Sequence, residues 1–189
     1  YEELDSLVLA VYMPSSYVHP SKMEKYAKMG GGGNLTLGGR ETGVRRLMTT
    51  NLLKRLESSV CSFRLTLERV LAAMSAALDT IDDYRKGLAS GASVADGDLP
   101  GGFDFDPDDE SGFEVGGATK ILVEDMDWMS WERDIEADVA VIEVLISMVR
   151  DIDPAHDAKL IELCEQIREK SQSPINPGNR KVLVFTAFS

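Results

Sequence analysis

The sequence of 189 residues contains only two cysteines and two histidines. Cys61 and Cys164 lie far apart, as do His19 and His156. Two isolated cysteines do not build a disulfide framework, and the four side chains lack the spacing of a zinc site. We therefore expect a chain from a reducing compartment such as the cytoplasm, without a metal site.

The sequence also lacks a long apolar run and a basic leader. No stretch approaches the roughly 18 consecutive apolar residues of a membrane span. Acidic residues stand among the first positions, where a secretory signal has basic ones. Aromatic residues make up only 7% of the chain, whereas Leu, Val, Ala and Met are abundant. We therefore expect no membrane association and a largely helical fold.

Two segments resemble ligand-binding loops but miss the residues that such loops need. Gly33 is followed by Asn34 and Gly39 by Arg40, whereas a P-loop ends in Gly-Lys-Ser or Gly-Lys-Thr. A calcium loop that began at Asp104 would need glycine at its sixth position, which is aspartate here. We interpret the glycines as a linker and the acidic segment as a solvated insertion.

Charge is distributed unevenly along the chain. The formal net charge is −12, which taken alone argues against nucleic acid as a ligand. Eight acidic residues and no Lys or Arg fall between Asp96 and Glu114, whereas seven basic and three acidic residues fall between Arg40 and Arg69. A basic segment and an acidic loop therefore coexist, and the net charge does not decide between classes of ligand.

Apolar residues recur at helical spacing in two long segments. A first helix from Gly43 to Lys86 would be about 60 Å long at about 1.5 Å per residue, and it would need a partner along its length. We expect the two segments to form an antiparallel hairpin over residues 40–153, with a Gly- and Asp-rich insertion at 88–119. The first row comprises Leu56, Val60, Phe63, Leu67, Val70, Met74, Leu78 and Ile81, and the second Trp128, Trp131, Ile135, Val139, Ile142, Ile146 and Val149.

Shorter elements flank this hairpin. Residues 1–39 are predicted to form entry helices, over Glu2–Tyr12 and from Ser21, and a glycine-rich loop. Residues 154–189 are predicted to hold a helix that ends near Lys170 and a buried parallel strand over Val182–Phe185. A lone strand needs a sheet, which we expect in sequence beyond this chain or in another chain. The fold class is therefore mostly α, with one C-terminal β-strand from an incomplete α/β domain.

Two stretches carry a family resemblance. The first is Asn51-Leu-Leu-Lys-Arg-Leu-Glu-Ser-Ser59, continuing to Phe63-Arg64, and the second is Lys181-Val-Leu-Val-Phe-Thr-Ala-Phe188. In this order they resemble bacterial Swi/Snf-like helicases and translocases of superfamily two, over residues 41–85 and 155–189. The resemblance implies a region between the first RecA-like domain and motif IV, the first strand of the second RecA-like domain.

The resemblance also implies a function. It implies the helical region that links the two lobes of an ATP-dependent motor on DNA or RNA, with Lys54, Arg55 and Arg64 in phosphate contact or interlobe bracing. It implies that Thr186 contacts the nucleic-acid backbone. The Walker A lysine, the Asp-Glu-x-His box and the motif VI arginine are absent. We therefore expect no catalytic residue here, with ATP and Mg²⁺ bound by the parent protein and the RecA-like lobes as intramolecular partners.

Other interpretations remain open. The same cations fit a solvated helix face with pairs such as Arg64 and Glu68. Trp128 and Trp131, three residues apart on an apolar row, fit core packing better than base stacking. The whole chain also fits a non-enzymatic helical scaffold that binds a partner protein, although such a scaffold would not need the C-terminal strand.

Overall fold

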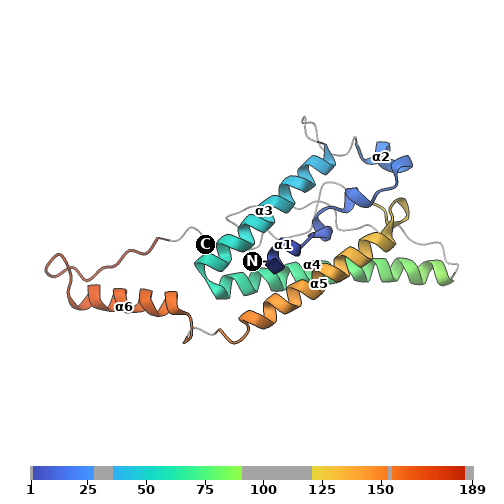
Figure 1. Cartoon of the computed structure of the whole chain (residues 1–189). Helices are drawn as coiled ribbons and strands as arrows, with labels where there is room; N and C mark the ends of the chain where they lie inside the picture. Colours follow the sequence, from blue (N-terminus) through green and yellow to red (C-terminus); the bar gives the residue numbers. More distant parts are fainter. Residues whose placement is uncertain (1, 28–35, 91–120, 153–154, 186–189) are drawn as a thin grey trace.

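The computed structural model describes residues 2–27, 36–90, 121–152 and 155–185, and this part of the chain is mostly helical. Three long helices form the body (Figure 1). They are α3 (Leu37–Ser58), α4 (Val60–Ser90) and α5 (Trp128–Val149). None of the described helices is long and apolar enough to span a membrane.

The expected pairing of the two apolar rows is confirmed. Helices α4 and α5 run in opposite directions and make the most extensive contact between any two elements (Figure 1). Most residues of the two rows are buried along this contact, and Leu67 and Ile142 are each 0% exposed. Trp131 is also buried, as expected for core packing. The α4–α5 contact is therefore the main hydrophobic core of the body.

The expected single helix from Gly43 to Lys86 is wrong, because the helix is interrupted at Ser59. This residue has an extended backbone, with φ −153° and ψ 125°. Its hydroxyl accepts a hydrogen bond from the Ser62 N–H at 3.3 Å and so caps α4. The Arg55 guanidinium donates to the Ser62 hydroxyl at 2.7 Å across the break. The break lets α3 fold back onto α4 instead of extending it.

The segment before α3 crosses the body as a chain of short elements. It contains the helices α1 (Glu2–Ser6) and α2 (Met23–Ala27). Three 3₁₀ turns lie between them: η1 (Ala10–Tyr12), η2 (Pro14–Tyr17) and η3 (Pro20–Lys22). They contact α3, α4 and α5. A fourth 3₁₀ turn, η4 (Val123–Asp125), precedes α5.

Three expected boundaries in this region are corrected. The helix over Glu2–Tyr12 is interrupted because Leu9 takes a left-handed backbone with φ 55°, which no helix accommodates. The second helix begins at Met23 rather than Ser21, after η3. Helix α3 begins at Leu37, earlier than expected, because the Thr36 hydroxyl accepts from the Gly39 N–H at 3.2 Å.

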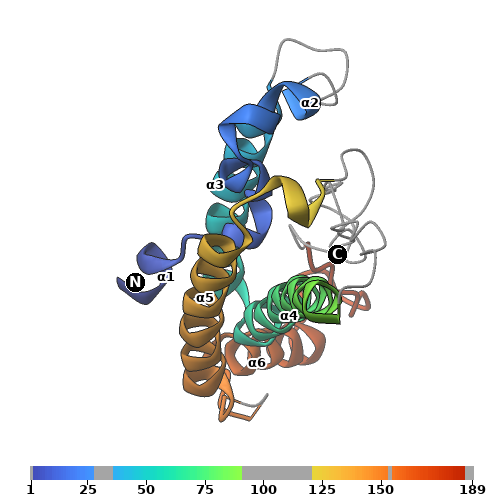
Figure 2. The ribbon, with the colours of Figure 1, turned by 90° about the vertical axis from the view of Figure 1, so that its right-hand side faces the viewer.

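The last part of the chain lies outside the body. Helix α6 (Ala158–Gln172) is separate from the three long helices and has no buried residue (Figures 1 and 2). Residues 181–185 do not form the expected strand, and Leu183 and Phe185 are 82% and 90% exposed. A strand needs a neighbour for its backbone hydrogen bonds, and the described residues supply none. Within them the sole β contact is the isolated bridge between Val18 and Met126.

Candidate functional site

The structure places the expected site residues in different surroundings. Lys54 is exposed on α3, whereas its neighbour Arg55 is 6% exposed and donates to Ser62. Arg64 is partly exposed on α4, with its Nε 4.0 Å from the Glu68 carboxylate. Thr186 lies outside the described residues. The structure therefore displays Lys54 and Arg64 to a ligand but places Arg55 inside the α3–α4 junction.

A row of polar and basic side chains runs along the exposed side of α3. Arg46, Thr50 and Lys54 are all exposed and follow each other at four-residue intervals, which places them on one helix face. Arg46 and Lys54 are about 12 Å apart along the axis, from eight residues at about 1.5 Å each. Neither forms an ion pair within the described ranges. We call Arg46, Thr50 and Lys54 the α3 basic edge.

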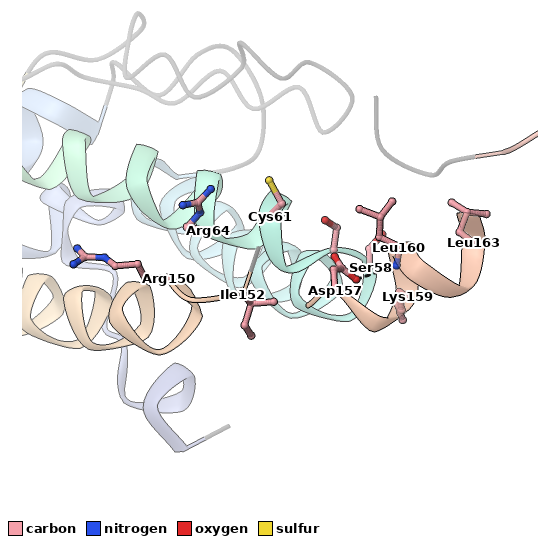
Figure 3. Close-up of a pocket in the computed structure, with 10 residues that line it drawn as sticks. Ser58, Cys61, Arg64, Arg150, Ile152, Asp157, Lys159, Leu160 and Leu163 are labelled. Carbon is pink, nitrogen blue, oxygen red and sulfur yellow. Dashed lines mark hydrogen bonds between the residues drawn. The ribbon is translucent and has the colours of Figure 1, made fainter. Parts of the chain in front are cut away.

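Arg64 belongs to a second surface, a groove of about 420 Å³ at the end of the body (Figure 3). One wall is formed by the α3–α4 junction and the end of α5, and the other by the start of α6. Residues that are remote in sequence meet here because α4 begins where α5 ends. The lining residues are Ser58, Ser59, Cys61, Arg64, Arg150, Ile152, Asp157, Lys159, Leu160 and Leu163.

The groove lining is cationic in a strongly acidic chain. It contains three cations, Arg64, Arg150 and Lys159, and one carboxylate, that of Asp157, so its formal charge is 3 − 1 = +2. Asp157 accepts from the Leu160 N–H at 3.0 Å as the N-cap of α6. The chain as a whole carries −12. The groove therefore favours anions over cations.

The cations of the groove differ in how they are engaged. The Lys159 ammonium donates to the backbone carbonyl of Glu57, at the C-terminal end of α3, where a positive charge is favoured. This is the hydrogen bond that joins α6 to the body in the part of the chain that the structure describes. Arg150 is exposed and forms no ion pair with any described residue. Arg150 and Arg64 are thus the cations most available to a ligand.

Buried carboxylates elsewhere belong to the architecture. Asp125 is 1% exposed and accepts from Lys25 and Tyr26, each at 2.6 Å, with Lys22 at 2.9 Å. Burial alone would raise the pKa of Asp125, but these hydrogen bonds outweigh it and hold the pKa below its ordinary value. The carboxylate therefore stays charged and ties α2 and η3 to η4, just before α5.

Two further carboxylates hold the N-terminal segment. Asp138 is 2% exposed on α5 and accepts from the N–H groups of Val8 and Ala10, each at 2.8 Å. Burial raises its pKa, and these hydrogen bonds oppose the shift. Glu41 on α3 accepts from the Ser15 hydroxyl at 2.5 Å, and burial raises its pKa to about 7. Because their oxygens are used in holding backbone, neither carboxylate fits a general acid or base.

The described residues contain no group of three His, Cys, Asp or Glu side chains that could hold a metal ion. Comparison with known proteins adds no family to this picture. No model of a protein family matches the sequence, no curated protein matches it, and no solved structure matches the fold.

Sequence reasoning missed three of the exposed cations. Arg46 had a usable signal, because it stands two helical turns before Lys54 on the same face. Arg150 and Lys159 had none, since they reach the groove only through the packing of α5 and the position of α6. Arg55 was singled out by its neighbours in the chain, and its burial depends on the break at Ser59.

Proposed function

We propose that the chain is the helical region that links the two RecA-like lobes of a Swi/Snf-like, ATP-driven helicase or translocase acting on DNA. The observation that carries the proposal is the order of two stretches along the chain. The stretch over Asn51–Ser59, continuing to Arg64, precedes a paired helix, and the stretch over Lys181–Phe188 follows it. A helical scaffold of another class would need neither stretch.

The α3–α4 junction supports the proposal. The Leu-Glu-Ser part of the first stretch ends α3, Ser59 forms the turn into α4, and Arg55 braces that turn through Ser62. The residues that carry the resemblance thus have a specific structural task. This contact braces the chain internally, and interlobe bracing by Arg55 stays a prediction.

The C-terminal stretch supports it in a different way. Leu183 and Phe185 are almost fully exposed, although a continuous apolar run of this kind is typical of a buried strand. An apolar extended segment gains stability when a sheet covers it and pairs its backbone. In the proposed protein the second RecA-like lobe supplies that sheet, and Thr186 extends the same strand toward the nucleic-acid backbone.

The proposal divides the chemistry between this chain and the lobes. The chain contains no Walker A lysine and no Asp-Glu-x-His box, so ATP and Mg²⁺ are bound by the flanking lobes. The α3 basic edge contacts backbone phosphates, and clustered cations bind phosphates by releasing their counterions. The purified chain alone should release no phosphate from ATP above the buffer background.

The reading frame that encodes the chain gives the most direct test. It should contain a Gly-Lys-Ser or Gly-Lys-Thr loop and an Asp-Glu-x-His box upstream, and the motif VI arginine downstream. A reading frame that encodes neither RecA-like lobe would contradict the proposed motor function. It would favour the alternative, a scaffold that binds a partner protein. The exposed apolar residues Leu160 and Leu163 of α6 would then be the first place to search for that partner's contact.

Duplex binding tests the α3 basic edge. Reversing both charges, with Arg46→Glu and Lys54→Glu, should weaken binding of a labelled duplex by more than about tenfold, because phosphate contacts are lost. Fluorescence anisotropy at low and moderate salt measures this, and the parent chain should bind less tightly as salt rises. Arg55→Glu is unsuitable because Arg55 is buried in the junction.

The matched control reverses two exposed cations on α6, with Arg168→Glu and Lys170→Glu. It changes the net charge by the same amount and should leave duplex binding close to that of the parent chain. An equal loss of duplex affinity in both double variants would show that net charge alone causes it. The α3 basic edge would then not be a contact surface.

A further inference from the structure

The groove beside α6 has features that the linking function does not require. It has a volume of about 420 Å³, which lies within the range of about 300–1,000 Å³ typical of small-molecule sites. Arg64 and Arg150 line one side of it, and the α6 wall presents Leu160 and Leu163 beside the charged Asp157 and Lys159. We propose that this groove binds a phosphate ester, with the phosphate on Arg64 and Arg150 and the organic part against Leu160 and Leu163.

The two arginines are suited to the phosphate. Figure 3 shows both on the side of the groove that α4 and α5 form, with the Arg150 guanidinium directed away from α6, so this side chain must turn toward Arg64 to share a phosphate. A guanidinium has five N–H donors and binds phosphate oxygens in pairs. Arg150 has no ion-pair partner among the described residues, and Arg64 is only loosely held by Glu68 at 4.0 Å. A bound phosphate would therefore displace little existing interaction.

Leu160 and Leu163, on the opposite wall, favour binding of a phosphate ester over inorganic phosphate. Leu160 and Leu163 point the same way from α6 in Figure 3 and line the groove, each 39% exposed. A sugar or base that covers them removes apolar surface from water, which stabilises the complex. Inorganic phosphate lacks that part and would engage the arginines alone.

The same chemistry has two sources. A nucleic-acid backbone carries phosphate diesters, and a free mononucleotide carries a phosphate monoester with a sugar and a base. The first source would deepen the proposed function, and the second would be independent of it. A short duplex and AMP therefore serve as separate probes, with inorganic phosphate as the third.

The two cysteines of the sequence make the site directly measurable. Both are exposed, and Cys61 lines the groove whereas Cys164 does not. AMP or the duplex in the groove should slow the alkylation of Cys61 by iodoacetamide and leave the rate at Cys164 unchanged. Mass spectrometry of the full chain measures both rates in one sample, so Cys164 is an internal control for reagent and fold.

Variants at the arginine decide the assignment. Arg150→Ala should raise the probe concentration needed to protect Cys61 by at least about tenfold, because a charge-assisted hydrogen-bond pair is lost. The probe concentration that protects Cys61 in Arg150→Lys should lie between those for the parent chain and Arg150→Ala, since lysine keeps the charge but not the paired donors. Arg168→Ala removes the same charge from an exposed site outside the groove lining and should behave as the parent chain.

Several results would overturn the inference. No protection of Cys61 by AMP or the duplex would do so, as would protection that persists in Arg150→Ala. Equal protection of Cys61 by AMP and by inorganic phosphate would show that Leu160 and Leu163 do not contribute to binding. The proposed function is judged separately. Duplex binding that is lost with Arg46→Glu and Lys54→Glu supports it, whereas the groove is judged by the protection of Cys61 and its loss in Arg150→Ala.

Discussion

Buried carboxylates fasten the N-terminal segment to the body at three points. Asp138 holds the backbone at Val8 and Ala10, Glu41 holds Ser15, and Asp125 holds Lys25. The segment between α1 and α2 consists of short turns with few internal backbone hydrogen bonds, so its groups need partners from the helices. These contacts add to the backbone hydrogen bonds of its own 3₁₀ turns.

Removing the Asp138 carboxylate should be costly. Asp138→Ala would leave the N–H groups of Val8 and Ala10 without an acceptor in a buried region, and we expect a loss of about 2–4 kcal/mol in the free energy of unfolding. Urea denaturation followed by circular dichroism measures it. Glu143→Ala, an exposed acidic residue on the same helix, should change stability by less than about 0.5 kcal/mol. Similar losses in the two variants would contradict the role of Asp138.

Glu41 should make stability depend on pH. Burial raises its pKa from 4.5 to about 7 in the folded chain, so the folded state holds a proton that the unfolded state releases between these values. The contribution of Glu41 to stability is therefore fully present below pH 4.5 and is lost as the pH rises toward about 7. Glu41→Gln should reduce this decrease, measured as the difference in urea midpoints between pH 5 and pH 8.

Asp138 shares this sign, because burial also raises its pKa. Asp125 acts in the opposite sense, because its lowered pKa makes its contribution disappear only at strongly acidic pH. Glu57→Gln, on the exposed side of the same helix, provides the matched control and should keep the pH dependence of the parent chain. A Glu41→Gln variant whose stability depends on pH as in the parent chain would show that another group causes the pH dependence.

At the scale of elements, the α4–α5 contact should dominate stability. Leu67 is 0% exposed in this contact, whereas Leu88 on the same helix is 53% exposed. Leu67→Ala should cost about 2–5 kcal/mol, since it removes buried methyl groups and leaves a cavity. Leu88→Ala is the control and should cost less than about 1 kcal/mol. Thermal melts that coincide for Leu67→Ala and the parent chain would show that the two rows do not pack as described.

The elements that could be predicted from sequence are those with long apolar periodicity. The rows through Leu67 and Ile142 identified α4 and α5 because most residues of each row are buried and the others pack against the core. The break at Ser59 escaped because the apolar row continues through it, and the break depends on a local cap rather than on a change of period. The left-handed Leu9 escaped for a similar reason, since Asp138 stabilises it from a remote helix.

The candidate site was predictable only in part, for a related reason. Sequence identified Lys54 and Arg64 as cations on helices, and both are accessible. The groove needs Arg150 and Lys159 as well, which belong to the end of α5 and the start of α6. No local sequence pattern predicts that the end of α5, the start of α6 and the α3–α4 junction lie together. Sites built from element ends require the packing of the whole chain before they can be recognised.

At the scale of the whole molecule, the body and α6 should differ in their contribution to folding. The hydrophobic core lies within residues 4–149, whereas α6 has no buried residue. Deleting residues 158–189 should therefore change the free energy of unfolding by less than about 0.5 kcal/mol, as for a surface alteration. Chemical denaturation of the shortened chain beside the full chain measures this difference.

Proteolysis tests the same difference without a deletion. Trypsin should cleave first after the exposed residues Arg168, Lys170, Arg180 and Lys181, because cleavage needs a backbone that opens locally and α6 has little packing to prevent it. Cleavage after the buried Arg55 should come last, since it requires the α3–α4 junction to open. Early cleavage at Arg55, or a large loss of stability on deletion, would mean that α6 packs on the body more firmly than its exposure indicates. The absence of both would leave α6 and residues 181–185 as a separate arm, which is the arrangement that the proposed second lobe requires.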